Sequence, residues 1–308
     1  MHEVRHDNPR WNSQLDRQIP HRLQTLLPPG STTAEARLRF YATQFSLVEV
    51  DSSYYAMPSA TNAQLWAERT PEHFTFNIKA FRLMTGHQTP REAFPKDLQA
   101  ALPDNGSKNI YYRHISDDLR DELWRRYREA ITPLRNAGKL GTVLFQFAPW
   151  LTSAAEGRAH IDECLLRMKG YTIATEFRNK SWFDERHRNA TLALEKENGL
   201  VHVVVDAPPD VSNRVQTVWE VTNPDLAMVR LHGRNTAAWN IKGALSSAER
   251  FNYDYSDEEL SELADNIRIL AKQVAQLHVI FNNNHEDQGQ RNARTLMEML
   301  AQHAVVHK

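Results

Sequence analysis

The chain has 308 residues, of which 41% are hydrophobic and 24% are charged, with a formal net charge of −1 at pH 7. This composition is ordinary for a globular protein, and it excludes long disorder and a global field that would attract nucleic acid or an anionic membrane. The single cysteine, Cys164, excludes an intrachain disulfide and fits a reducing compartment. We therefore expect a cytoplasmic protein with Cys164 as a packed thiol.

The N-terminal residues give no sign of export or membrane insertion. Residues 1–18 are polar and of mixed charge, without an apolar segment of signal-peptide length. No stretch of the chain approaches the ~20 apolar residues that a membrane-spanning helix needs. We therefore expect no membrane partner.

Short runs rich in β-branched and aromatic residues alternate with longer amphipathic segments along the chain. Thr32 and Glu35 predict a capping box at the start of the first helix. Ser116 predicts the start of a later helix, and Ser256 with Glu259 predicts a second capping box. The runs that predict strands are residues 47–50, 74–79, 142–147, 172–177, 201–206, 226–232 and 277–282.

Seven such repeats predict a parallel sheet, either closed into a TIM-like (β/α) barrel or open and doubly wound. A barrel needs an eighth strand, and its expected place is before Thr32. Residues 1–30 contain no strand pattern, so we expect the first strand to be atypical or missing. The domain prediction is one (β/α)-barrel domain over residues 1–308, with residues 1–31 as an atypical, poorly ordered N-terminal segment.

Polar or ionisable residues follow almost every predicted strand. Ligands of parallel α/β sheets bind at the carboxyl ends of the strands, and charges there are costly unless paired or solvated. We therefore predict a polar ligand pocket at this end. The alternative is that acids and bases pair one for one and only close the barrel mouth. The residues at strand ends are Glu49, Asp51, Lys79, Gln146, Glu176, Arg178, Asp206, Arg230, His232, Arg234, Asn282 and Asn283.

The last two predicted strands lead into turns suited to an anion. Arg230, His232 and Arg234 surround Gly233, and an Asn-rich turn follows the final strand. Many barrels bind phosphate at this place, with backbone N–H groups and arginines as donors. We therefore expect an anionic group of a ligand to bind here, although turn chemistry alone also produces such sequences.

A divalent metal is the competing interpretation, because acids and a histidine gather at the strand ends. However, no metal-binding spacing is present, and the cations among these residues would repel a metal ion. Dinucleotide, nucleotide-phosphate and serine-nucleophile motifs are absent as well. We expect neither a metal nor a cofactor.

Aromatic residues crowd the loops that follow the strands. They could stack against a sugar or a base, or simply pack the loops onto the barrel rim. His87 follows the second predicted strand and could reach the site, or lie at the surface. The aromatic residues are Tyr54, Tyr55, Trp150, Trp182, Trp239, Tyr253 and Tyr255.

The order of these motifs resembles the YecE-like family, domain of unknown function number seventy-two. The matching stretches between about Thr32 and Leu300 are residues 45–55, 74–79, 85–87, 144–146, 176–178 with Trp182, 204–208, 229–234 and 281–283. The resemblance implies a TIM-barrel-like fold but no settled activity. Members usually open with a Gly-rich, Trp-containing strand, whereas residues 1–18 here offer only Trp11. The positions implied to match the family's characteristic polar residues are Glu49, Lys79, Gln146, Glu176, Arg178, Asp206, Arg230, His232 and Asn282.

Three functions remain open: an enzyme acting on a small anionic or sugar-like substrate, a nucleic-acid binding or processing protein, and a non-catalytic ligand-binding protein. The first is favoured, because groups of both charges suit acid–base catalysis and charge stabilisation. The sequence predicts no oligomeric state. The predicted catalytic residues are Glu49, Lys79, Glu176, Asp206 and His232. The predicted substrate-binding residues are Gln146, Arg178, Arg230, Arg234, Asn282, Asn283, Tyr55 and Trp182.

Overall fold

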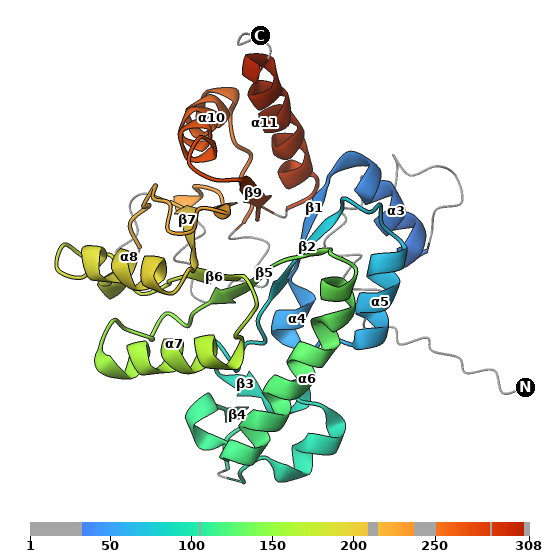
Figure 1. Ribbon diagram of the computed structural model, residues 1–308, viewed down its shortest axis with the longest axis vertical. Helices are drawn as coiled ribbons and strands as arrows, with labels where there is room; N and C mark the ends of the chain where they lie inside the picture. Colours follow the sequence, from blue (N-terminus) through green and yellow to red (C-terminus); the bar gives the residue numbers. More distant parts are fainter. Residues whose placement is uncertain (1–32, 105, 209–214, 237–250, 284, 305–308) are drawn as a thin grey trace, which may run out of the picture.

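The structure, a computed structural model, describes residues 33–104, 106–208, 215–236, 251–283 and 285–304. Helices surround a parallel sheet (Figure 1). The sheet strands are β1 (Leu47–Val50), β2 (Thr75–Lys79), β5 (Leu140–Gln146), β6 (Ile173–Glu176), β7 (Val201–Asp206), β8 (Leu226–Leu231) and β9 (Gln276–Phe281). The helices are α3 (Ala34–Gln44), α4 (Ser52–Tyr55), α5 (Ala60–Glu68), α6 (Asp117–Asn136), α7 (Ala155–Arg167), α8 (Arg188–Glu197), α10 (Asp257–Ala271) and α11 (Gln288–Ala304).

The seven strands form a nearly closed barrel. They are hydrogen-bonded in the order β1-β2-β5-β6-β7-β8-β9, and every pair is parallel. The edge strands β1 and β9 approach each other (Figure 1). Arg294 of α11 donates to Gln44 of α3 at 2.6 Å and links the helices beside these two edges. The prediction of a TIM-like barrel is confirmed, and the expected place of an eighth strand lies outside the described residues.

The predicted strands and helix starts agree closely with the structure. Both ends of each of the seven strands are predicted to within two residues. Ser116 and Ser256 are N-caps, and Ser256 forms the predicted capping box with Glu259. The capping box of the first helix was predicted wrongly: Thr33 is the N-cap and accepts from Ala36 N, so the third helical position is an alanine. An alanine there cannot complete a capping box.

The barrel interior is built in layers. Leu144, Ala174, Val203 and Met228 lie on neighbouring strands and form one buried apolar cluster. Side chains alternate between the two faces of a strand, so residues two positions further along point the same way. On β5, β6 and β8 those residues are Gln146, Glu176 and Arg230. A polar layer therefore lies directly above the apolar one at the carboxyl ends of the strands.

Two further expectations concern burial and membranes. Cys164 of α7 is buried, with Sγ 3.4 Å from the carbonyl oxygen of Met84. Burial raises the pKa of this thiol well above its usual value, as expected for a packed thiol. Among the helices of the described residues, none combines the length and the apolar character needed to cross a bilayer.

Candidate acid–base site at the barrel mouth

Arg230 of β8 is the centre of the polar layer. Its side chain is completely buried, and Nη2 lies 2.6 Å from Glu49 Oε1. Nη1 forms an ion pair with Glu176 and donates to Gln146 Oε1 at 3.3 Å. Predicted site residues from β1, β5 and β6 therefore meet at the guanidinium of Arg230 from β8. Its two carboxylate partners offset the large cost of burying its charge.

A second set of side chains lies above Arg230. Arg178, which follows β6, forms an ion pair with Glu176, and its Nη2 is 3.2 Å from His232 Nε2. His232 Nδ1 is hydrogen-bonded to Asn282 at 2.9 Å. Burial, and then the positive charge of Arg178, lowers the pKa of His232 to about 3. His232 is therefore neutral at physiological pH.

The two buried carboxylates differ in how far they are engaged. Burial alone would raise the pKa of Glu176, but Arg178 and Arg230 together hold that pKa well below its usual value. Glu176 is therefore a fixed anion between two guanidiniums. Glu49 uses Oε1 for Arg230, and its buried Oε2 has no hydrogen-bond partner among the described residues. Glu176 Oε1 has no hydrogen bond there either, but it forms an ion pair with Arg178. Glu176 is therefore engaged by two guanidiniums and Glu49 by one.

Lys79 lies at the end of β2 beside the same layer. Its Nζ is 2.6 Å from Asp51 Oδ1 and 4.8 Å from the centre of the Tyr54 ring. The hydroxyls of Ser53 and Tyr127 donate to the Lys79 carbonyl oxygen at 2.7 and 3.0 Å and fix the end of this strand. Lys79 is thus held by an acid that is itself partly exposed at the mouth.

Arg82 is a basic residue of this region that the sequence reasoning missed. Its guanidinium lies 5.3 Å from the Tyr54 ring, and its buried Nε has no hydrogen-bond partner in the described ranges. Within the described part of the chain, no carboxylate lies within ion-pair distance of Arg82. The only sequence signal was its position three residues after Lys79, at the turn that follows β2.

Asp206 and Arg234 form a second network. Arg234 Nη2 lies 2.9 Å from Asp206 and Nη1 lies 3.2 Å from Glu259, at the start of α10. The Tyr255 hydroxyl donates to Asp206 at 2.7 Å and accepts from Gly233 N at 2.9 Å. These contacts hold the turn after β8. They also pair the charges of Asp206 and Arg234 with protein groups, without a ligand.

Other predicted residues lie away from this layer. Trp182 is completely buried, stacks on Phe177 with ring centres 4.3 Å apart, and donates from Nε1 to a backbone carbonyl. Asn283 is also buried and donates to Asn292 Oδ1 and to a backbone carbonyl. Tyr55 lies on the rim with 44% of its surface exposed. Trp239 lies outside the described residues.

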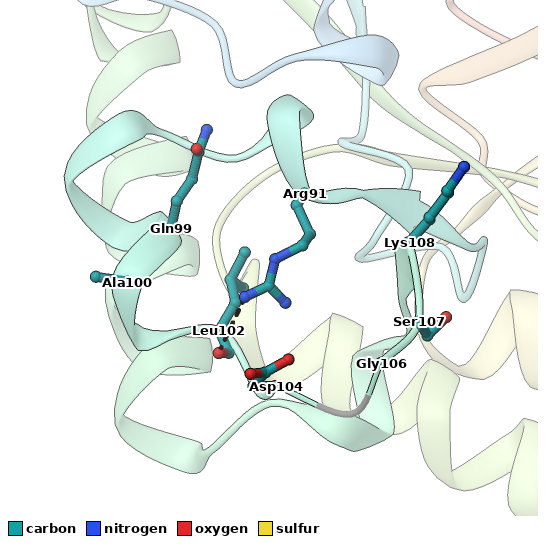
Figure 2. Close-up of a pocket in the computed structure, with 8 residues that line it drawn as sticks. All are labelled: Arg91, Gln99, Ala100, Leu102, Asp104, Gly106, Ser107 and Lys108. Atoms are coloured by element: carbon teal, nitrogen blue, oxygen red, sulfur yellow. Dashed lines mark hydrogen bonds between the residues drawn. The ribbon is translucent and has the colours of Figure 1, made fainter.

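A surface hollow occurs elsewhere, in the excursion between β2 and α6 that contains β3 (Thr89–Pro90) and β4 (Asn109–Ile110). Figure 2 shows Arg91 reaching into this hollow. Arg91 donates to the carbonyl oxygens of Pro103 and Leu102 at 2.8 and 3.4 Å, so its charge is already engaged. None of the predicted site residues lines the hollow. In the described ranges, no three side chains of His, Cys, Asp or Glu gather so as to hold a metal ion.

Comparisons with known proteins agree with the fold. The family model described as "Protein of unknown function DUF72" matches residues 17–308. The UPF0759 protein YunF of Bacillus subtilis is 32% identical over 274 residues, which cover 88% of this chain and 89% of that protein. A DUF72 family protein of Enterococcus faecalis superimposes with a TM-score of 0.73 at 28% identity, covering 86% of this chain and 88% of that chain. One from Thermotoga maritima gives 0.68 at 25% identity, covering 89% and 92%.

Proposed function

Because the chain belongs to the DUF72 family, whose description gives no activity, we propose its function from the site itself. We propose that it is an enzyme acting on a small anionic or sugar-like substrate at the carboxyl ends of the barrel strands. The observation that carries this proposal is the pair of buried carboxylates, Glu49 and Glu176, beneath cations that reach the mouth. Burying two acidic side chains inside the barrel is costly for stability, which favours a chemical role.

The anionic group of the substrate binds to the cations of the mouth. Arg82 has no acidic partner among the residues that the structure describes, and the side chain of Arg178 is 21% exposed above Glu176. Lys79 is the third cation, held in place by Asp51. Two guanidiniums and an ammonium provide directed donors for a phosphate or carboxylate.

Proton transfer belongs to Glu49. Glu49 pairs with one arginine, and its Oε2 has no hydrogen-bond partner among the described residues, whereas both oxygens of Glu176 face arginines, which it serves to position. A general base must reach the proton that it removes, and such a group contributes typically ~10²–10⁴-fold to the rate. Negative charge that develops on the substrate is stabilised by Arg178 and Lys79.

Turnover of sugar phosphates tests the catalytic proposal. We expect the purified protein to convert ribose 5-phosphate or glucose 6-phosphate, and the conversion can be followed by NMR. We expect Glu49→Gln to lower the rate of conversion by about 100-fold. Glu197→Gln, at the exposed carboxyl end of α8, is the matched control and is expected to retain the rate. Equal rates in Glu49→Gln and the native protein would contradict the role of Glu49. Conversion of neither compound would contradict the proposed substrate class.

A further inference from the structure

Four rings form a continuous series along the rim, from α4 to the loop after β5. The ring centres of Tyr55 and Tyr54 are 4.9 Å apart, those of Tyr54 and His87 are 5.3 Å apart, and those of His87 and Trp150 are 5.7 Å apart. We call these four residues the aromatic row. They come from loops after β1, β2 and β5, so the row lies at the same end of the barrel as Glu49 and Lys79.

The two ends of the aromatic row are exposed but fixed. Trp150 is 51% exposed, yet its Nε1 donates to the carbonyl oxygen of Gly86 at 3.1 Å. Tyr55 is 44% exposed and packs edge-on against Tyr54. Leaving apolar ring surface in water loses stabilisation, and an aromatic side chain that is already immobilised loses little entropy when it binds a ligand. Neighbouring rings of the row meet edge to face, with interplanar angles of 88°, 83° and 69°, so the stacking surface is the face of an exposed end ring, Trp150 or Tyr55.

Cations flank the aromatic row, while its own histidine is neutral. Lys79 and Arg82 both lie over the Tyr54 ring. Burial, and then the positive charges of Arg82, Lys79 and Arg178, lowers the pKa of His87 to about 3. His87 Nδ1 is hydrogen-bonded to the Thr85 hydroxyl at 2.9 Å, which fixes the ring. A ligand here would meet an uncharged aromatic surface directly beside positive charge.

We propose that the aromatic row binds a planar ring of the ligand whose anionic group is bound by Arg82 and Lys79. The substrate class is then an anion that carries a flat heteroaromatic ring, as a nucleoside monophosphate does. This inference rests on the proposed function for the position of the anionic group. It adds a specificity subsite that a phosphate or a sugar phosphate alone does not use.

Calorimetric titration with ribose 5-phosphate and with AMP tests the subsite. AMP is expected to bind about tenfold more tightly than ribose 5-phosphate, because a stacked base contributes at least that much. Trp150→Ala or Tyr55→Ala, whichever removes the ring that stacks on the base, is expected to reduce this ratio while leaving the affinity for ribose 5-phosphate unchanged. The matched control is Tyr171→Ala. Tyr171 also lies under an arginine, with Arg135 4.6 Å from its ring, but it precedes β6 at the opposite end of the barrel.

The possible outcomes separate the two proposals. If both compounds bind with equal affinity, the stacking subsite is overturned and the proposed anion site survives. The subsite is also overturned if the preference for AMP persists in both Trp150→Ala and Tyr55→Ala. If neither compound binds, the anion site fails together with the subsite. A lower ratio in at least one of the two rim variants but not in Tyr171→Ala supports the inference.

Discussion

At the scale of single residues, the Arg230 guanidinium links the site to the stability of the barrel. Arg230→Met removes the counter-charge of two buried carboxylates, Glu49 and Glu176. We expect the free energy of unfolding to fall by about 3–5 kcal/mol, measured by urea denaturation. A triple variant that also carries Glu49→Gln and Glu176→Gln is expected to regain more than half of that loss, since the charge then left without its carboxylate is that of Arg178, whose side chain is 21% exposed. A loss below about 1 kcal/mol in Arg230→Met would show that the ion pairs are not buried as described.

The buried, neutral His232 predicts a pH dependence of stability. Its pKa falls from the usual 6.5 to about 3 in the folded protein. The unfolded chain therefore takes up a proton below pH 6.5 while the folded chain does not, so stability is present above 6.5 and is lost as the pH falls toward 3.

His232→Asn should make this dependence weaker. We expect the slope of the unfolding free energy between pH 6.5 and 5 to decrease by about 1 kcal/mol per pH unit. His202→Gln is a suitable control. Burial tends to lower the pKa of His202, but the Glu195 carboxylate raises it overall, so its contribution is lost as the pH rises above 6.5 instead. An unchanged acid-side slope in His232→Asn would argue against a neutral His232.

At the scale of elements, the turn after β8 depends on Gly233. It has a φ of +83°, and a Cβ at this position would lie 2.5 Å from the Tyr253 side chain. Gly199 also has a positive φ, of +62°, but a Cβ there would meet nothing within 4 Å. Gly199→Ala therefore measures backbone strain alone, and we expect it to lower the free energy of unfolding by about 1 kcal/mol. Gly233→Ala is expected to cost at least 1–2 kcal/mol more, by thermal or urea unfolding. Equal losses would mean that the turn moves away from Tyr253 at no cost.

Lys139 connects the start of β5 to the end of α5. Its Nζ donates to the carbonyl oxygens of Ala67 and Thr70 at 2.5 and 2.7 Å, and to the Thr70 hydroxyl at 3.2 Å. Lys139→Met leaves these carbonyl oxygens without a donor and is expected to cost about 1–3 kcal/mol in unfolding experiments. Lys169→Met, at an exposed position after α7, is expected to change stability by less than about 0.5 kcal/mol. If the two variants behave alike, Lys139 does not cap the helix.

At the scale of the whole molecule, the barrel was predictable because its signals are local. Strands covered on both faces appear as continuous apolar runs, and the strand over Val201–Asp206 was found without error. The capping box of Ser256 and Glu259 depends on only four consecutive residues. The convergence of Glu49, Glu176 and Arg230 followed from one rule, that parallel strands end at the same edge of the sheet.

The rest depends on contacts between residues far apart in the sequence. Asn282 and Asn283 are equally polar, yet the first contacts His232 and the second is buried against Asn292. Trp182 resembles an exposed loop aromatic in the sequence, but the chain folds it beneath Phe177. The backbone N–H of Arg82 donates to the carbonyl oxygen of Tyr54 in α4, which holds Arg82 beside the segment that follows β1. None of these contacts has a local pattern.

The central claim, an anion site at the carboxyl ends of the strands, is tested most directly by anomalous diffraction from crystals soaked in tungstate, a heavy analogue of phosphate. The proposal predicts an anomalous peak within hydrogen-bonding distance of the Arg82 or Arg178 guanidinium. Peaks at other basic residues, with none at the barrel mouth, would contradict it.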